Sequence, residues 1–397
     1  MSPPGTVFGV RAHCPRTRAR AGVLNLPRGN LDTPLFMPVG TLGTVKALTP
    51  GELETLGAGL ILANAYHLHV RPGSETIARL GGLHRFMGWD RSILTDSGGY
   101  QVFSLRSRAR VTDDGVTIND PATGELVELS PERVIEMEGL LGSDIMMPLD
   151  QPVPYGTSAA RTVEATARSD HWAARACAER ERRGLTAPGC LLFGIQQGGF
   201  SEELRAESAR RVGELPFDGY AVGGLSFGEP PEVTRRLSRL SADALPEDRP
   251  RYLMGVGLPL DIVQAVADGI DMFDCVLPTR LARHGVAFVA DVPVQLRHAR
   301  WREEGAPLDP GCTCEACARY PAAYVAHLVR AKEILGCRLL TLHNVHQYLR
   351  LMERIRAAIV ARTFSAFAED IESRTAGAGD SPDREEEVSE WSPQAAN

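Results

Sequence analysis

Two aspartates, Asp96 and Asp274, each end an apolar segment that has the length and composition of a buried strand. A carboxylate in such a place is costly unless it is paired or hydrogen-bonded. Two carboxylates that meet across one site can perform glycosidic chemistry, because one attacks the anomeric carbon while the other handles the proton of the leaving group. The alternative is that each aspartate only caps the loop or helix after it, which is the more common role of an isolated Asp near glycine.

A second set of residues has the donors and acceptors that read a guanine-like base. An ionised Asp150 accepts two hydrogen bonds from an N1–H/N2–H edge, and Gln197 offers both a donor and an acceptor. The Gly-Gly pairs at 198–199 and 223–224 allow the backbone to approach a flat ligand closely, although a tight turn would also explain them. These residues predict a base-binding site if the fold brings them together.

Four further side chains could complete such a site. Tyr100 and Met254 could hold the base between them, although a methionine is more often a core residue. Arg280 and Arg283 follow the last apolar segment and could hold phosphates beside the reacting sugar. Taken alone, the two arginines would more simply be a solvated surface pair.

Three cysteines, Cys312, Cys314 and Cys317, fall within six residues and predict a metal site. A structural zinc ion takes four nitrogen or sulfur ligands, so a fourth ligand must come from elsewhere in the chain. Free thiols or a redox pair are the alternative. The spacing does not choose the fourth ligand among four candidates, which are Cys337, His343, His346 and His327.

Eight apolar segments separated by helical patterns must position these residues. Strand–helix alternation predicts a parallel sheet covered by helices, and eight strands favour a closed (β/α)8 TIM barrel over an open doubly wound sheet. In a barrel the carboxyl ends of all strands face one side, where the polar residues would converge. The predicted strands are Phe36–Thr41, Leu60–Ala65, Ile93–Asp96, Asp144–Asp150, Leu191–Ile195, Tyr220–Gly223, Arg251–Gly255 and Asp271–Val276.

The chain divides into four predicted parts. The barrel occupies residues 1–289, with helices such as Pro131–Leu141 and a polar hairpin insertion at about 106–129. A zinc-binding insertion follows the eighth strand at 290–344. A C-terminal helical segment at 345–371 is expected to pack on the barrel, and an acidic tail at 372–397 is expected to be disordered.

Composition places the chain among ordinary globular proteins. Hydrophobic residues make up 43% of the 397 positions and charged residues 23%. No segment approaches the roughly 20 apolar residues of a membrane span, and no signal peptide is recognisable, so we expect a cytoplasmic protein without a membrane partner. Eight cysteines in so long a chain favour a metal site over a disulfide framework. The net charge of −7, of which −5 falls in residues 371–397, neither requires nor excludes a nucleic-acid partner.

Several motifs, which follow one another along the chain in the order given at the end of this paragraph, resemble those of the bacterial tRNA-guanine transglycosylases, also called queuine tRNA-ribosyltransferases. The resemblance runs from about Phe8 to about Asp370. It implies a (β/α)8 barrel with one structural zinc ion per subunit, acting as a homodimer on the anticodon loop of tRNA. The motifs are Thr-Asp-Ser-Gly-Gly-Tyr-Gln-Val-Phe-Ser at 95–104, Gly-Ile-Gln-Gln-Gly at 194–198, Tyr-Leu-Met-Gly-Val-Gly at 252–257, Met-Phe-Asp-Cys-Val-Leu-Pro-Thr-Arg at 272–280, the cysteine cluster, and Thr-Leu-His-Asn at 341–344.

The resemblance also implies roles for individual residues. Asp274 matches the nucleophile of the family and Asp96 its general acid/base. The positions that recognise and stack on the base match Asp150, Gln197, Gly224, Leu225, Tyr100 and Met254. The RNA-backbone positions match Arg280 and Arg283, and the zinc ligands match Cys312, Cys314, Cys317 and His343.

The implied reaction exchanges guanine at the wobble position of GUN-anticodon tRNAs for a 7-deazaguanine. The usual bacterial substrate is 7-aminomethyl-7-deazaguanine, and queuine is the alternative. Gln151-Pro152 and Phe227 depart from the family pattern beside the base site, and Phe227 could either narrow the site or turn outward. Other interpretations are a non-catalytic subunit, the archaeosine branch, or a zinc-dependent barrel hydrolase, which would place His and Asp ligands at strand ends.

Overall fold

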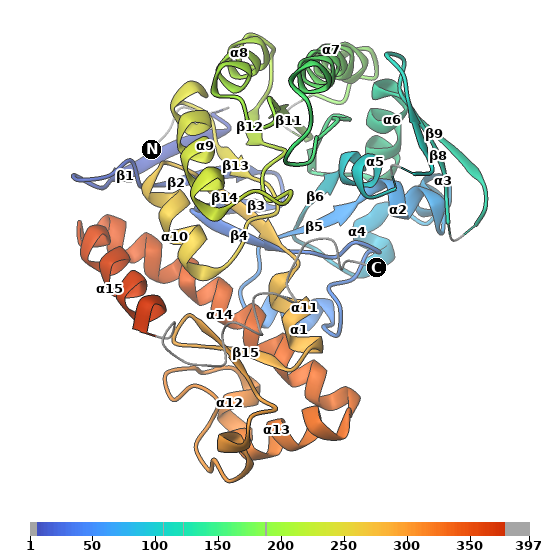
Figure 1. The fold of residues 1–397 in the computed structure, drawn as a ribbon. Coiled ribbons are helices and arrows are strands. Elements are labelled where there is room, and N and C mark those ends of the chain that lie inside the picture. Colours follow the sequence, from blue (N-terminus) through green and yellow to red (C-terminus); the bar gives the residue numbers. More distant parts are fainter. Residues whose placement is uncertain (1–5, 106, 122, 187–188, 378–397) are drawn as a thin grey trace.

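Eight parallel strands form a nearly closed barrel in the computed structural model, which describes residues 6–105, 107–121, 123–186 and 189–377. The strand order is β4-β14-β13-β12-β11-β10-β6-β5, and a parallel bridge between Val39 and Leu62 brings β4 beside β5 (Figure 1). All eight predicted strands are present, so the TIM-barrel prediction is confirmed. Their bounds are β4 Leu35–Pro38, β5 Leu60–Asn64, β6 Ser92–Asp96, β10 Ile145–Met146, β11 Leu191–Gln196, β12 Gly219–Val222, β13 Arg251–Leu253 and β14 Met272–Cys275.

The strands are nearly continuous apolar runs because both of their faces are buried. On β11, Leu191, Phe193 and Ile195 belong to the cluster inside the barrel, whereas Leu192 packs outward with helix residues. Each fully buried Leu or Phe side chain contributes roughly 1.5–3 kcal/mol to folding. The interior is therefore a packed core, and chemistry is confined to the ends of the strands.

Helices cover the outside of the barrel. Helix α6 matches its predicted bounds because Ser130 caps its first turn, accepting a 3.1 Å hydrogen bond from the Arg133 amide, and Gly142 ends it with a φ of +73°. The helices between and just after the strands are α1 Pro50–Thr55, α2 Ala65–Val70, α3 Ser74–Arg79, α4 Gly82–Met87, α5 Gly99–Ser104, α6 Pro131–Leu141, α7 Ala159–Arg182, α8 Glu202–Gly213, α9 Pro231–Ala244, α10 Pro259–Ala267 and α11 Leu277–Arg283.

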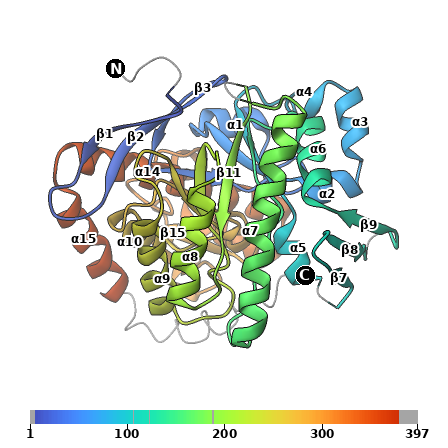
Figure 2. The same ribbon diagram turned by 90° about the horizontal axis from the view of Figure 1, so that it is seen from above.

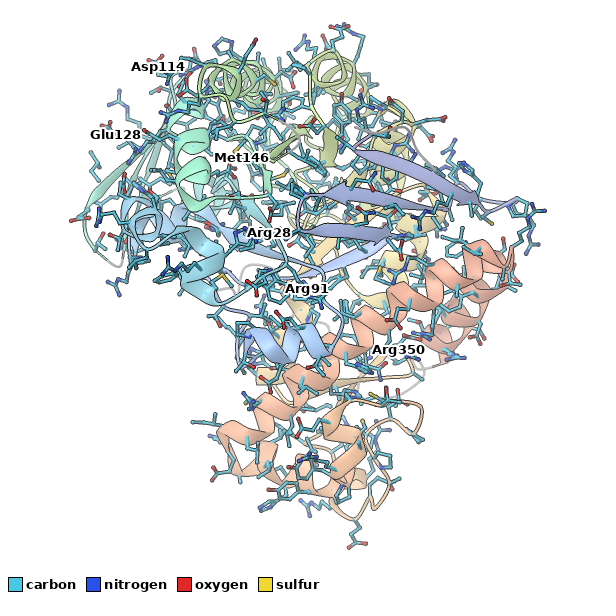
Figure 3. The ribbon with its side chains drawn as sticks, turned by 180° about the vertical axis from the view of Figure 1, so that it is seen from behind. Arg28, Arg91, Asp114, Glu128, Met146 and Arg350 are labelled. Atoms are coloured by element: carbon cyan, nitrogen blue, oxygen red, sulfur yellow. The ribbon has the colours of Figure 1, made fainter. Side chains whose placement is uncertain are left out.

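A three-stranded antiparallel sheet precedes the first predicted strand and was not anticipated from the sequence. It consists of β1 Phe8–His13, β2 Arg20–Leu26 and β3 Gly29–Thr33. Figure 3 shows these strands from behind, with Arg28 in the turn between β2 and β3. Leu24 and Leu26 join the cluster inside the barrel, and Arg28 lies 3.4 Å from Asp144 at the start of β10. The sheet therefore covers the amino end of the barrel, opposite the predicted site.

The insertion predicted as a hairpin at 106–129 is a small sheet of three strands. These are β7 Ala109–Val111, β8 Val116–Asn119 and β9 Leu126–Leu129, paired antiparallel in sequence order. Figure 2, the view from above, shows them to one side of the barrel next to α5. Buried residues of β8 and β9 pack in one cluster with residues of α6, which explains why the alternating stretch Val116–Ile118 is stable at the surface of the barrel.

The segment after the barrel forms a separate lobe beneath it in Figure 1. The long helix α14 begins earlier than predicted and joins this lobe to the barrel. A left-handed residue, Arg362 with φ of +60°, then separates α14 from α15 within the segment predicted as one helical stretch. The elements are β15 Val286–Val289, β16 Val292–Gln295, η1 Ala299–Arg302, α12 Glu315–Arg319, α13 Ala322–Ala331, α14 Ile334–Val360 and α15 Phe364–Gly377.

Helix α15 also continues to Gly377, so the first six residues of the predicted tail, 372–377, are helical. The rest of that tail, 378–397, lies outside the described residues. Among the helices that the structure describes, none combines the length and apolarity needed to cross a membrane.

Candidate active site and metal centre

Asp274 lies at the carboxyl end of β14 and is almost fully buried. Its Oδ1 accepts a 2.5 Å hydrogen bond from the Tyr252 hydroxyl and a 2.8 Å hydrogen bond from the Gly255 amide. Burial raises the pKa of Asp274, whereas these two donors favour its charged form. The sequence analysis singled out Asp274 but missed Tyr252 and Gly255, which come from the neighbouring strand β13 and the loop after it.

Asp96 ends the strand β6 on the same side of the barrel. Burial, together with the negative charges of Asp150 and Asp274, raises its pKa to about 7. Its Oδ2 accepts a 3.2 Å hydrogen bond from Asn64, the residue paired with it on β5. The structure thus brings the predicted carboxylates into electrostatic contact, and one of them has the pKa of a proton-transfer group that works at neutral pH.

Asp150 and Gln197 meet directly, as required of a joint base site. The Gln197 side-chain nitrogen donates a 2.6 Å hydrogen bond to Asp150 Oδ2. Burial raises the pKa of Asp150 to about 7, although the bond from Gln197 opposes the shift. The Gln197 side-chain oxygen is buried and has no hydrogen-bond partner among the described residues, so it is free to accept a bond from a ligand.

Steric crowding explains why glycine occupies positions in both Gly-Gly pairs. A Cβ on Gly224, whose φ is +68°, would overlap the Gln197 amide, and a Cβ on Gly198 would overlap the backbone of Arg205. Leu225, the next residue, is buried. Glycine therefore lets the β12 loop lie against the Gln197 side chain. The close approach of the backbone to a ligand stays a prediction.

Tyr100, Phe103 and Phe227 form a cluster of aromatic rings beside this site. Tyr100 on α5 is 39% exposed, and its ring centroid lies 5.9 Å from that of Phe227 and 6.0 Å from that of Phe103. Phe227 packs edge-on against Phe103 at 4.8 Å. Phe227 is therefore turned onto α5. Met254 is half-buried just after β13, and its stacking role with Tyr100 stays a prediction.

Arg280 and Arg283 lie on α11, the short helix that directly follows the Asp274 strand. Arg283 is exposed, and it donates a 2.8 Å hydrogen bond to the Thr279 carbonyl. Partial burial and the positive charge of Arg280 lower the pKa of Arg283. Two like charges therefore sit close together just beyond Asp274, where an anionic ligand would relieve their repulsion.

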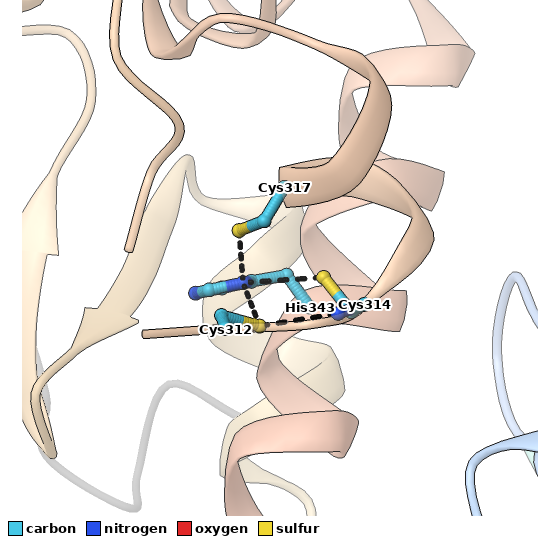
Figure 4. Close-up of side chains that lie close together, drawn as sticks. All are labelled: Cys312, Cys314, Cys317 and His343. Carbon is cyan, nitrogen blue, oxygen red and sulfur yellow. Dashed lines mark hydrogen bonds between the residues drawn. The ribbon is translucent and has the colours of Figure 1, made fainter. Parts of the chain in front are cut away.

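Cys312, Cys314, Cys317 and His343 come together in the lobe beyond the barrel (Figure 4). Their four ligand atoms lie within 4.8 Å of one another, and His343 Nδ1 is 3.6, 3.6 and 3.3 Å from the three sulfur atoms. A tetrahedral zinc ion with ordinary bond lengths needs nitrogen–sulfur separations of about 3.6 Å. The group therefore suits a metal ion, and it includes His343 rather than Cys337, His346 or His327.

His343 and its neighbour Asn344 fasten this group to the rest of the chain. His343 Nε2 lies 2.7 Å from the Phe288 carbonyl, which fixes the ring and leaves Nδ1 for a metal. Asn344 accepts a bond from the Phe288 amide and donates to the carbonyls of Pro278 on α11 and Val286 on β15. The residue that follows His343 on α14 therefore connects the Cys3His group to α11.

The fold and site define a (β/α)8-barrel enzyme whose buried carboxylates lie at the carboxyl end of the strands and whose Cys3His group lies beyond the last strand. Residues 14–376 match the family model described as queuine tRNA-ribosyltransferase. The chain therefore belongs to the queuine tRNA-ribosyltransferase family. It is a tRNA-guanine transglycosylase, a transferase that exchanges guanine in tRNA.

Individual relatives agree with the family model over nearly their whole length. The chain is 51% identical to the queuine tRNA-ribosyltransferase of Zymomonas mobilis over 357 residues, which cover 90% of this chain and 92% of that protein. It is also 51% identical to that of Thiobacillus denitrificans, covering 88% and 94% of the two chains. Identity to that of Prochlorococcus marinus is 49%, covering 90% and 95%.

Proposed function

We propose that the protein replaces guanine at the wobble position of GUN-anticodon tRNAs, those for Asp, Asn, His and Tyr, with 7-aminomethyl-7-deazaguanine in queuosine biosynthesis. The observation that carries this proposal is the group of three carboxylates, Asp96, Asp150 and Asp274, at one end of the barrel, of which Asp150 and Asp274 are buried and Asp96 is half-buried. Holding three acids together largely out of water is costly. A ribose and a purine are ligands that would use all three.

Asp274 is the proposed nucleophile. In the first displacement it attacks C1′ of the target nucleoside, the C1′–N9 bond breaks, and guanine leaves with a proton from Asp96. In the second, the incoming base loses its N9 proton to Asp96, and N9 attacks C1′ and expels the Asp274 carboxylate. Two inversions give net retention. Tyr252 and Gly255 both donate to Asp274 Oδ1, so Oδ2 is the oxygen that we assign to the attack.

Asp150, Gln197, Gly224 and Leu225 are the proposed base-recognition residues. An ionised Asp150 would accept the N1–H and N2–H donors of the base, and Gln197 has an unpaired acceptor beside it. The target nucleotide must be splayed out of the anticodon loop to reach Asp274, which single-stranded loops allow at modest cost. Tyr100 and Met254 would then cover the two faces of the base.

Phe227 supports 7-aminomethyl-7-deazaguanine over queuine as the incoming base. Its ring lies against Tyr100 and Phe103, so it bridges the β12 loop to α5 instead of pointing away from the site. A bulky cyclopentenediol on the 7-substituent would have to displace this aromatic group, whereas an aminomethyl group is small. Queuine remains the second candidate because it differs only in that substituent.

The remaining assignments concern the metal, the RNA and the assembly. We propose one structural zinc ion per subunit on the Cys3His group, since a thiolate-rich set with four ligands leaves no open position for catalysis. Arg280 and Arg283 would contact the RNA backbone. The protein would act as a cytoplasmic homodimer, for which the stacked Tyr320–Tyr324 pair, partly exposed on the outer lobe, offers apolar surface.

The test supplies each base in turn to enzyme and tRNA that carries labelled guanine at the wobble position. We expect release of label with 7-aminomethyl-7-deazaguanine and at least about tenfold slower release with queuine, because bulk at the 7-position has to displace Phe227. A tRNA with adenine at that position is the matched control. No release with either base would refute the proposed activity, and equal rates would refute the choice between the two bases.

A further inference from the structure

Arg205 on α8 is fully buried behind the base-recognition loops. Helix α8 packs against β11 and lies over the β11 and β12 strands (Figure 1). No carboxylate forms an ion pair with Arg205 among the described residues, and the negative charge of Glu229 acts on it only from beyond ion-pair distance. Burial lowers the pKa of Arg205 to about 9, which still leaves the guanidinium charged at neutral pH.

The guanidinium instead binds backbone carbonyls from two different loops. Its Nε donates a 2.8 Å hydrogen bond to Gly199 in the loop after β11. One terminal nitrogen, Nη2, donates to Gly223 at 3.0 Å and to Gly224 at 3.4 Å in the loop after β12. The other terminal nitrogen, Nη1, is buried without a hydrogen-bond partner in the described structure.

Two of these carbonyls, those of Gly223 and Gly224, belong to peptide groups of the loop that we propose to bind the base. The Gly223 carbonyl shares its peptide with the Gly224 amide, and the Gly224 carbonyl shares its peptide with the Leu225 amide. In a trans peptide the carbonyl and the N–H point in opposite directions. Because Arg205 holds both carbonyls on the side of α8, the Gly224 and Leu225 N–H groups point away from α8. The hydrogen bonds to the carbonyls also make these N–H groups stronger donors.

The same helix holds the backbone of Gln197 through Ser208, one turn after Arg205. The Gln197 amide donates a 3.2 Å hydrogen bond to the Ser208 hydroxyl, which in turn donates to Asp170 at 2.6 Å. An apolar side chain could fill the space of Arg205 without the cost of burying a charge. What it could not supply is a rigid planar fork that joins two loops.

We infer that Arg205 is a positioning residue for base recognition, which sets the Gln197 loop and the Gly224–Leu225 amides against the same purine. The inference deepens the proposed function and rests on it. Because the Gly224 and Leu225 amides are hydrogen-bond donors, the ligand atom that they bind is an acceptor, such as the 6-oxygen of guanine. Arg205 itself does not touch the base.

The experiment compares the Arg205→Lys variant with wild type in steady-state exchange. Lysine keeps the charge but cannot reach both loops at once. We expect the KM for the free base to rise roughly tenfold, as for loss of a hydrogen bond to a charged group, while kcat and the KM for tRNA change less than about twofold. Direct titration should show a similar loss of guanine affinity and a smaller loss for 2-aminopurine, which lacks the 6-oxygen.

Arg180→Lys is the matched control. Arg180 is also buried and also binds carbonyls, those of Leu185 and Cys190, but it lies at the amino end of β11. Its replacement should lower thermal stability and leave the KM for base unchanged. An equal rise in base KM for both variants, an unchanged base KM in Arg205→Lys, or failure of Arg205→Lys to fold would overturn the inference. Absence of exchange by wild type would instead refute the proposed function.

Discussion

The two polar clusters of this protein are built on opposite principles. At the carboxyl end of the barrel, Asp96, Asp150 and Asp274 lie close together and largely out of water. Burial raises the pKa of all three carboxyl groups, and the negative charges of Asp150 and Asp274 add to the shift of Asp96. In the outer lobe, three cysteines and His343 are also crowded together, but a single cation can satisfy all four. The first cluster loses folding free energy to keep reactive groups together, whereas the second gains it when metal binds. Substitution of an aspartate should therefore lower activity more than stability, and substitution of a cysteine should lower stability more than activity.

The largest effect is expected from Asp274→Asn. An amide cannot form the ribosyl ester, so base exchange should fall by at least about 1,000-fold. Thermal stability should stay equal or rise, because a buried charge is removed while Tyr252 and Gly255 can still donate to the amide oxygen. Rates in single-turnover exchange and melting curves would measure both quantities.

Asp271→Asn provides the control three residues earlier on the same stretch of chain. Asp271 is fully buried at the amino end of the barrel, and it binds Arg20 at 2.6 Å. Its substitution should cost roughly 3–5 kcal/mol of stability without blocking the chemistry. A tRNA adduct that survives denaturation in Asp274→Asn would contradict the assignment of the nucleophile.

Cys314→Ser should have the reverse profile. Loss of one thiolate weakens metal binding, whose free energy contributes directly to folding, so the zinc content and the melting temperature should both fall. We expect a loss of several kcal/mol, with the chemical step slowed only as far as folded protein is lost. His346→Ala, which removes a histidine outside the cluster, should retain the metal. Full zinc occupancy in Cys314→Ser, measured by elemental analysis, would show that the ligand set is wrong.

The last prediction concerns the dependence of stability on pH. Because the pKa of Asp96 is raised from 3.8 to about 7, the folded protein keeps a proton that the unfolded chain releases. Its contribution to stability is complete below about pH 4 and is lost as the pH rises to about 7, up to about 4 kcal/mol. Asp96→Asn should therefore lose less stability between pH 4 and pH 7 than wild type does. Chemical unfolding across that range provides the measurement, and parallel curves would contradict the raised pKa.

The sequence predicted the features that depend on neighbouring residues. Strands such as Leu191–Ile195 were recognisable because both of their faces are buried, and α6 because its Ser130 cap is local. Features that depend on distant partners were missed. Strand β2 begins at Arg20, whose partner Asp271 lies 251 residues away, so its first residue looks like surface.

Within the candidate site, too, the residues that a local pattern marks were predicted and those that depend on distant partners were missed. Asp96 stands next to a glycine pair and Asp274 ends an apolar strand, so both could be named from the sequence as candidates. Asn64, Tyr252 and Arg205 act only through contacts with other strands or loops, so no local pattern marks them. Arg205 in particular lies on a helix rich in charged residues, where an arginine would be expected to face solvent.

The adjacency of His343 and Asn344 on α14 links the Cys3His group to the helix for which we propose an RNA contact. His343 lies against the three cysteines, while Asn344 binds the Pro278 carbonyl in the helix that carries Arg280 and Arg283. A chelator would therefore act at a distance. If the proposed roles hold, it would loosen the helix that carries Arg280 and Arg283 and leave the acids within the barrel in place. We therefore expect metal-depleted enzyme to bind a free purine while its affinity for tRNA falls.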